Sequence, residues 1–198
     1  MENRKLLDQI LDTMNMNQAV QQVKRNKGAA GVDGMTVDQL TAYLALNRDD
    51  LLEAIRKRSY KPDPVLRVEI PKPAGGVRLL GIPTVKDRMI QQAIAQVLTP
   101  IFDRQFSEYS YGFRPRRYAE MGIVKALEYM NEDHDWIVDI DLERFFDTVN
   151  HDRLMNLVSR KVKDGDVISL IRKFLVSGVQ IDDEYQETII GTSQGGLC

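Results

Sequence analysis

The stretch IVDIDLERFFDTVNH, residues 137–151, combines three aspartates with a pair of adjacent aromatic rings. The acids are Asp139, Asp141 and Asp147, and the rings are Phe145 and Phe146. Anions gathered this closely need either cations that neutralise them or a chemistry that uses them.

The apolar run WIVDI, residues 136–140, predicts a β-strand. Because side chains alternate along a strand, Ile137, Asp139 and Asp141 would share one face. The opposite, packed face would carry Val138, Ile140 and Leu142. Carboxylates at a strand end are ligands that Mg²⁺ selects, and a bound ion could polarise a phosphoryl group. The alternative is structural: the acids pair with nearby arginines and Asp147 caps the helix that follows.

Residues 65–83, VLRVEIPKPAGGVRLLGIP, predict a β-hairpin, because alternating apolar residues flank a Pro-Ala-Gly-Gly turn. Three prolines favour an edge position for it. Lys72 and Arg78 flank the turn and could grip a triphosphate, although basic residues also flank many solvent-facing hairpins. Near the end of the chain, Gln194 precedes two glycines that allow a nucleotide or a backbone to approach closely.

Helical periodicity recurs along the rest of the chain and predicts an α+β fold. Helices are predicted over residues 3–14, 17–26, 36–45, 49–58, 85–102, 119–131, 151–162 and 164–178. Thr36, after a glycine-rich loop, can cap the helix that follows it. Thr84 and Asp87 form a capping-box pattern ahead of residues 85–102. Residues 179–196 are predicted to form two paired strands that end in a loop.

The charge is unevenly distributed along the 198 residues. Residues 55–125 hold 14 lysines and arginines against 6 acids, and the remainder holds 13 against 23. This asymmetry indicates a segment that meets polyanions, or else a solvated basic face. A single cysteine, Cys198, excludes a disulfide framework. With no long apolar run and a charged N-terminal sequence, we expect a cytoplasmic protein without membrane partners.

Five blocks carry a resemblance to a known family. They read NKGAAGVDGMT, RVEIPKPAGGVRLLGIPTVKDRMIQQAIAQVLTPIF, FSEYSYGFRPRR, IVDIDLERFFDTVNHD and GTSQGG. In this order the chain resembles the reverse transcriptase domain of bacterial group II intron-encoded proteins, the maturase/reverse transcriptases. The resemblance implies the fingers and first part of the palm of a right-hand polymerase. Residues of about 1–95 and 105–134 would be fingers, and about 96–104 and 135–198 would begin the palm.

The resemblance also assigns roles near the active site. It implies that Asp141 is the first metal-binding carboxylate of a two-metal Mg²⁺ site and that Leu142 supplies a backbone carbonyl. Asp139 receives no role. Phe146 would lie under the sugar of the incoming nucleotide and exclude a 2′-hydroxyl, while Phe145 would pack into the core.

Further roles concern the nucleotide and the nucleic acid. The resemblance implies that Lys72 and Arg78 hold the triphosphate and that Gln194 lies near the nucleotide and template base. The residues implied to line the nucleic-acid path are Arg67, Arg88, Tyr111, Phe113, Arg114, Arg116 and Arg117. For Arg88 and Arg117, a structural salt bridge is an equal alternative.

Two departures from the family pattern matter. Relatives have proline where this chain has Ser193, which would loosen the turn before Gln194. The sequence ends at Cys198, before the family's second catalytic carboxylate pair, the thumb and the maturase region. We therefore expect this chain to be inactive as a polymerase by itself, because two-metal chemistry needs carboxylates on both sides.

The resemblance implies an RNA-directed DNA polymerase of a group II intron, copying intron RNA into DNA and assisting splicing. Its partners would be group II intron RNA, an RNA template with a DNA primer, and deoxynucleoside triphosphates. One alternative is a non-catalytic RNA-binding module that assists intron folding, and another is a related phage-defence or CRISPR-associated reverse transcriptase. The sequence is compatible with a homodimer but does not predict one.

Overall fold

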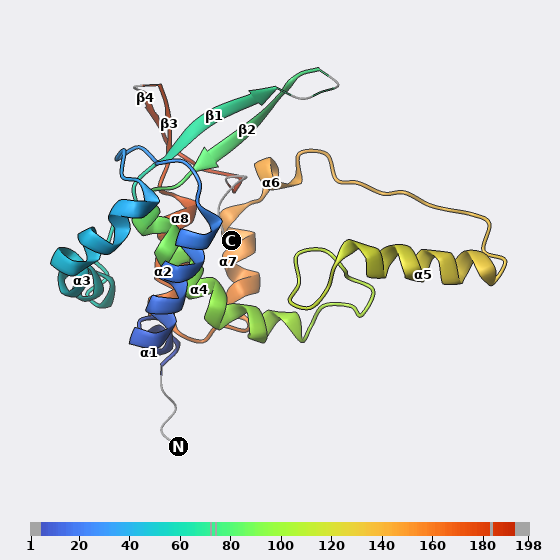
Figure 1. The fold of residues 1–198 in the computed structure, drawn as a ribbon, viewed down its shortest axis with the longest axis horizontal. Helices are drawn as coiled ribbons and strands as arrows, with labels where there is room; N and C mark the ends of the chain where they lie inside the picture. The colour runs from blue at the N-terminus through green and yellow to red at the C-terminus, as the bar shows by residue number, and fades with distance from the viewer. Residues whose placement is uncertain (1–4, 72, 74, 183, 193–198) are drawn as a thin grey trace. The chain divides into compact units, whose positions relative to one another are not determined.

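The chain forms two compact units, residues 1–97 with 144–198 and residues 98–143. The structure is a computed structural model and describes residues 5–71, 73, 75–182 and 184–192. Its elements, of which Figure 1 labels all but η1, are α1 (Leu6–Ile10), α2 (Thr13–Asn26), the 3₁₀ turn η1 (Val37–Gln39), α3 (Leu40–Arg56), β1 (Val65–Pro71), β2 (Val77–Ile82), α4 (Val85–Asp103), α5 (Ala119–Asn131), α6 (Phe145–Thr148), α7 (His151–Ser159), α8 (Gly165–Leu175), β3 (Val179–Ile181) and β4 (Glu184–Gln186). The α+β class is therefore confirmed.

Most helices of the first unit bury one apolar face, whereas the short helix α6 has no buried residue. The most buried side chains include Ile10, Leu40, Met89, Ile90 and Val167. Removal of such side chains from water is the main stabilising term for this unit.

Polar bridges at the edge of this core join helices that are distant in sequence. Asn15 Nδ2 donates to the Ala93 carbonyl at 3.0 Å, and Gln96 Nε2 donates to Asn15 Oδ1 at 2.7 Å. The Leu7 amide donates to Asp164 Oδ2 at 3.0 Å and so links α1 to the start of α8.

Helix boundaries follow local capping. Asp12 accepts from the Met14 amide at 2.9 Å, so α2 begins at Thr13 and the helix predicted over residues 3–14 is divided in two. The two helices predicted over 36–45 and 49–58 are instead one continuous α3, because residues 46–48 contain no glycine or proline to break it. At its start the Thr36 amide donates to Gln39 Oε1 at 2.8 Å.

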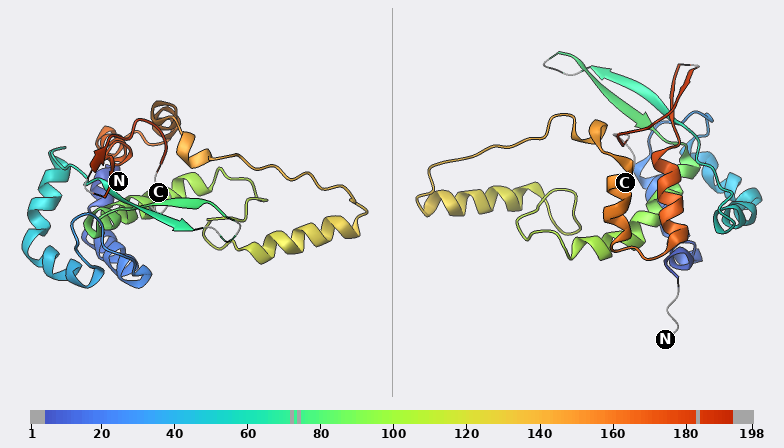
Figure 2. Two further views of the ribbon diagram at one scale, coloured as in Figure 1. Left: turned by 90° about the horizontal axis from the view of Figure 1, so that it is seen from above. Right: turned by 180° about the vertical axis from the view of Figure 1, so that it is seen from behind.

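The first unit contains a four-stranded sheet in the order β2-β1-β3-β4. The hairpin predicted over residues 65–83 is confirmed, with Arg67 opposite Gly81 and Ile70 opposite Arg78. The two paired strands predicted within residues 179–196 are confirmed as β3 and β4. Parallel pairing of Val65 with Val179 joins the two hairpins. The β1–β2 hairpin projects from the helices of its unit (Figures 1 and 2).

A buried polar network fixes the base of this hairpin. Asp87, in the first turn of α4, accepts hydrogen bonds from the hydroxyl of Tyr60, from Thr84 Oγ1 at 2.7 Å and from the Asp63 amide at 3.1 Å. Lys86 Nζ lies 2.8 Å from Asp63 Oδ2. Burial raises the pKa of Asp87, and burial together with the Asp87 charge raises the pKa of Tyr60. The network therefore ties α4 to the segment that leads into β1.

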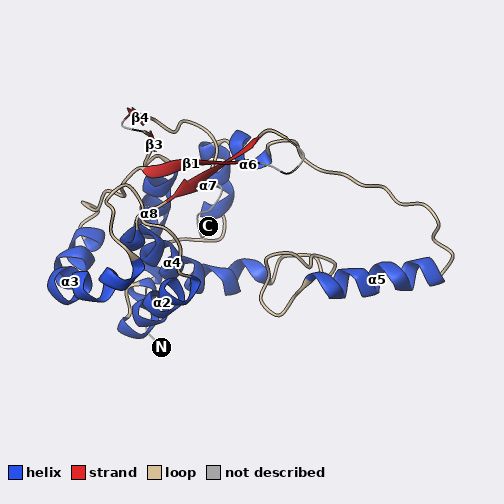
Figure 3. Cartoon of the chain, turned by 45° about the horizontal axis from the view of Figure 1, so that its top comes forward, coloured by secondary structure: helices blue, strands red, loops and turns tan. Residues whose placement is uncertain are grey.

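The strand predicted over residues 136–140 is wrong in this structure. Residues 135–142 form neither helix nor strand and appear as loop in Figure 3. The face expected to be packed is exposed, with Val138 at 82%, Ile140 at 80% and Leu142 at 63%. A strand needs a neighbour that takes its backbone N–H and C=O groups, and none of the described strands pairs with this segment.

Among the residues that the structure describes, no helix combines the length and apolar character needed to cross a membrane.

Candidate functional site

The aromatic pair lies on the short helix α6. The rings of Phe145 and Phe146 meet edge-on with centroids 5.6 Å apart, and they are 51% and 52% exposed. The expectation that Phe145 packs into the core is therefore wrong. A helix of one turn presents neighbouring residues on different sides but has too little surface to bury either ring.

The segment before Gln194 is held against α6. The Thr192 amide donates to the Phe146 carbonyl at 2.7 Å, and the Gly191 amide donates to the Val149 carbonyl at 2.8 Å. Gly191 has φ +84°, and an added Cβ would lie 2.8 Å from the Asp147 carbonyl oxygen. Only glycine permits this approach, which brings two distant sequence blocks together. Gln194 itself lies outside the described residues.

A buried histidine that the sequence analysis left unassigned supports the same contact. His151, at the start of α7, is 4% exposed, and its Nε2 lies 2.6 Å from the Gly191 carbonyl oxygen. The sequence feature that could have drawn attention to His151 is its position at the start of a helix, directly after the capping residue Asn150. Asn150 caps α7 by accepting a hydrogen bond from the Arg153 amide at 2.9 Å.

Arg67 and Arg78 lie on opposite faces of the β1–β2 hairpin. Residues directly opposite in an antiparallel ladder share a face, so Arg78 lies with Ile70 and Arg67 lies with Gly81 on the other face. Arg78 is exposed next to the turn, and Gly75 and Gly76 have the positive φ values that this turn requires. Lys72 lies outside the described residues.

The acidic segment belongs to the second unit. Asp141 is exposed, and its Oδ1 accepts from the Leu142 amide at 2.9 Å. No described arginine or lysine forms an ion pair with Asp139 or Asp141, so the structural alternative in which arginines neutralise these acids finds no support. Asp147 instead pairs with Arg144, at 3.3 Å from its Nε.

The donors at Asp141 and Leu142 have the chemistry of a hard-cation site. A carboxylate with a free oxygen and a backbone carbonyl are ligands that Mg²⁺ accepts. Within the described ranges, no three His, Cys, Asp or Glu side chains gather closely enough to hold a metal. These residues therefore fit one side of a metal site.

Arg114 organises the loop between α4 and α5. Its side chain is 9% exposed, and its Nε lies 2.8 Å from Asp103 Oδ1. It also donates to the carbonyls of Ser107 at 2.6 Å and Ser110 at 3.2 Å and lies over the Phe106 ring. The hydrogen bond from Arg114 lowers the pKa of Asp103. These contacts give Arg114 a structural task inside the second unit.

Arg88 has a comparable task in the first unit. Its guanidinium donates to the carbonyls of Lys27 at 3.3 Å and Ala29 at 2.7 Å, and a Cβ at Gly28 would lie 2.6 Å from its Nη1. Burial lowers the pKa of Arg88, an effect that the nearby Asp33 charge opposes. Arg88 therefore positions the glycine-rich loop.

The other candidate residues of the nucleic-acid path lie on the loop before α5. Arg117 lies over the ring of Tyr111 at 5.7 Å from the centroid. Phe113 and Arg116 are exposed and have positive φ values of 54° and 60°. This loop thus presents an aromatic ring and two guanidinium groups.

Comparison with known families gives one match. The model of the family described as reverse transcriptase (RNA-dependent DNA polymerase) matches residues 70–198. Among curated proteins, the chain is 33% identical over 180 residues to the group II intron-encoded protein LtrA of Lactococcus lactis subsp. cremoris, covering 90% of this chain and 30% of that protein.

Two further relatives extend the comparison. The putative COX1/OXI3 intron 2 protein of Saccharomyces cerevisiae is 31% identical over 199 residues, which is 98% of this chain and 23% of that protein. Protein YkfC of Escherichia coli is 34% identical over 178 residues, 87% of this chain and 47% of that protein. The chain thus spans less than half the length of each of these relatives. The resemblance to group II intron-encoded proteins is confirmed.

A solved structure shares the fold. A chain of a partial Cas6-RT-Cas1–Cas2 complex superimposes with a TM-score of 0.63 at 23% identity, covering 98% of this chain and 32% of that chain. The similarity confirms the fold class expected from the sequence.

Proposed function

The chain belongs to the reverse transcriptase (RNA-dependent DNA polymerase) family. We propose that it forms part of an RNA-directed DNA polymerase of a group II intron. This enzyme would copy intron RNA into DNA and assist splicing. Residues of about 1–95 and 105–134 would be the fingers, and 96–104 and 135–198 the start of the palm. Support comes from relatives named as intron-encoded proteins and nuclear intron maturases.

The nucleotide would be bound where α6 meets the segment before Gln194. The Phe146 ring is half exposed, and the Phe146 carbonyl holds Thr192, two residues before Gln194. We assign Phe146 to the sugar of the incoming nucleotide and Gln194 to its base region. This contact is the single observation that best supports the proposal, because it joins two separate sequence blocks at one place.

The triphosphate would be held by Lys72 and Arg78 at the hairpin tip. Arg78 is exposed and has no ion-pair partner among the described residues, so its guanidinium is available for bidentate binding of phosphate.

The reverse transcriptase family implies a divalent metal ion, and we propose Mg²⁺. Asp141 and Leu142 would hold it through a carboxylate oxygen and a backbone carbonyl oxygen. The ion, when bound, would lower the pKa of the attacking hydroxyl and neutralise charge on the phosphoryl group. The exposed position of Asp141 leaves its second oxygen free for this task.

The nucleic acid would bind along the basic loop before α5. Tyr111, Phe113, Arg116 and Arg117 would contact the template or primer through stacking and phosphate binding. Arg88 and Arg114 would act through the backbone segments that they hold. The partners would be intron RNA, a primed template and deoxynucleoside triphosphates, and the protein would act in the cytoplasm.

A second candidate function is RNA binding without chemistry, which the excess of cations over residues 55–125 favours. Both functions predict RNA affinity that falls steeply with salt. Primer extension on an RNA template by the complete gene product separates them. The polymerase requires Mg²⁺ and deoxynucleotides and yields DNA, whereas salt-sensitive RNA binding with no extension product would favour the binding module.

A further inference from the structure

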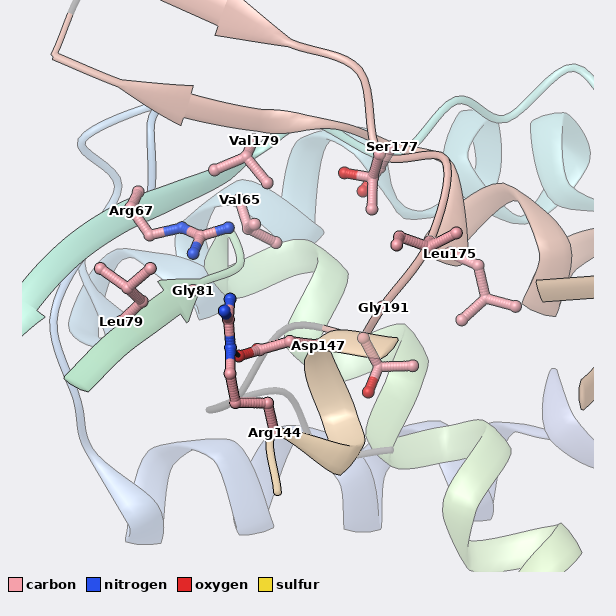
Figure 4. Close-up of a pocket in the computed structure, with 13 residues that line it drawn as sticks. Val65, Arg67, Leu79, Gly81, Arg144, Asp147, Leu175, Ser177, Val179 and Gly191 are labelled. Carbon is pink, nitrogen blue, oxygen red and sulfur yellow. Dashed lines mark hydrogen bonds and ion pairs between the residues drawn. The ribbon is translucent and has the colours of Figure 1, made fainter. Parts of the chain in front are cut away.

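A cavity of about 230 Å³ lies between the β1–β2 hairpin, α6 and the segments around β3. All of its lining residues belong to the first unit. Two of them are arginines, Arg67 from β1 and Arg144 from the start of α6. Figure 4 shows both guanidinium groups turned into the same space.

We propose that this cavity is a binding site for a phosphate group. Arg67 and Arg144 would provide the charge, and Thr188 and Thr192, whose side chains carry hydroxyl donors, also line the cavity. A phosphate offers several acceptor oxygens, and the planar guanidinium fork matches them in pairs.

The strongest evidence for a phosphate-binding site comes from Arg67. Its Nε is buried and has no hydrogen-bond partner, and no other atom of its side chain forms a hydrogen bond or ion pair with the described residues. Buried polar atoms in folded proteins are nearly always satisfied, so an unpaired guanidinium nitrogen indicates a missing acceptor. The alternative is purely structural: the aliphatic part of the Arg67 side chain covers apolar surface while its guanidinium group reaches water. A buried Nε fits that alternative poorly.

The local charge also favours an anion. Asp147 is the one carboxylate among the lining residues, against two guanidinium groups. Its pairing with Arg144 runs through Nε at 3.3 Å, which leaves the terminal nitrogens of Arg144 for another oxyanion. The cavity therefore keeps one uncompensated positive charge.

This site is separate from the proposed triphosphate grip. The ladder register places Arg67 with Gly81 on one face of the hairpin and Arg78 with Ile70 on the other. A phosphate group at Arg67 is therefore not the one that Arg78 would hold. Its source would be either the backbone or end of a nucleic acid, or a free phosphate or pyrophosphate.

Isothermal titration calorimetry of the 198-residue chain with inorganic phosphate, at constant ionic strength and without Mg²⁺ or nucleotide, tests the proposal. Arg67→Gln and Arg144→Gln should each weaken binding about tenfold, the loss expected for one charge-assisted hydrogen-bond pair. Asp147→Asn should strengthen it, because the opposing carboxylate is gone. Arg56→Gln, at an exposed arginine in the last turn of α3, is the matched control and should bind normally. Circular dichroism checks that each variant is folded, and Arg67→Lys keeps the charge should Arg67→Gln fail to fold.

Competition identifies the source of the phosphate. Displacement by pyrophosphate assigns a free anion, displacement by RNA that lacks a terminal phosphate assigns the backbone, and displacement only by 5′-phosphorylated RNA assigns a strand end. Primer extension by the complete gene product does not enter this assay, so failure here is distinguishable from failure of the polymerase proposal. Absence of binding to the unaltered chain, or equal affinities for Arg67→Gln, Arg144→Gln and Arg56→Gln, would overturn the site.

Discussion

Replacing Tyr60 by phenylalanine tests the network that anchors the hairpin to α4. Tyr60 is 7% exposed, and its hydroxyl donates to Asp87, which is 1% exposed. Phenylalanine keeps the ring and its contact with Phe174 at a centroid distance of 6.4 Å, so the change removes the hydroxyl alone. A hydrogen bond to a buried charged acceptor contributes about 1.5–3 kcal/mol. We expect the free energy of unfolding to fall by about 2 kcal/mol, or about 4–8 °C in Tm for a chain of this size.

The pH dependence of this loss gives a second, independent readout. Burial raises the pKa of Asp87, while the Tyr60 hydroxyl is the largest of the influences that lower it. Without that donor the pKa of Asp87 rises further, so the native state binds its proton more tightly than the unfolded chain does. Stability contributed by protonated Asp87 is lost as the pH rises from about 4 through the raised pKa. The penalty of Tyr60→Phe should therefore be larger at pH 7 than at pH 4.

Urea unfolding followed by circular dichroism measures both quantities. Tyr43→Phe is the matched control, because the Tyr43 hydroxyl makes no hydrogen bond to the described residues. The account of the network fails if Tyr60→Phe loses no more stability than Tyr43→Phe, or if its penalty grows toward acid pH.

Three further perturbations address the site. Gly191→Ala places a Cβ 2.8 Å from a carbonyl oxygen at a residue with positive φ, and should lower the free energy of unfolding in urea by about 2–4 kcal/mol. Gly34→Ala, at φ +69° with open space around the Cβ, should lower it by about 1 kcal/mol. Equal losses would show that the close approach at Gly191 is not the cause. Arg114→Ala should expose residues 104–113 to limited proteolysis, while Arg104→Ala, at an exposed side chain, should not; identical digestion patterns would argue against the role of Arg114. Phe146→Ala should let the complete gene product incorporate ribonucleotides, and continued strict exclusion would count against the ring.

Local signals in the sequence predicted most helices and strands of both units. The helix over 119–131 and the hairpin over 65–83 follow from periodicity and from turn chemistry within a few residues, and the structure has both. Parallel pairing of Val65 with Val179 depends on residues more than a hundred positions apart, which no local pattern reports. The predicted strand over 136–140 shows the same limit, since its formation depends on a neighbouring strand and not on its own alternation.

The candidate site was predictable to the extent that its motifs are contiguous. Phe146 and the segment before Gln194 were both singled out, but their contact through Thr192 and Gly191 appears only in the fold. The unpaired Nε of Arg67 also required the structure, because burial and the absence of a partner are tertiary properties.

Primer extension by the complete gene product with Asp141→Ala tests the central claim most directly, because only the chemistry, not RNA binding, depends on this carboxylate. Asp139→Ala is the matched control, a second exposed acid two residues away on the same loop. The account predicts loss of extension for Asp141→Ala with unchanged RNA affinity, and retained extension for Asp139→Ala. Normal extension by Asp141→Ala would contradict the assignment of the metal-binding carboxylate.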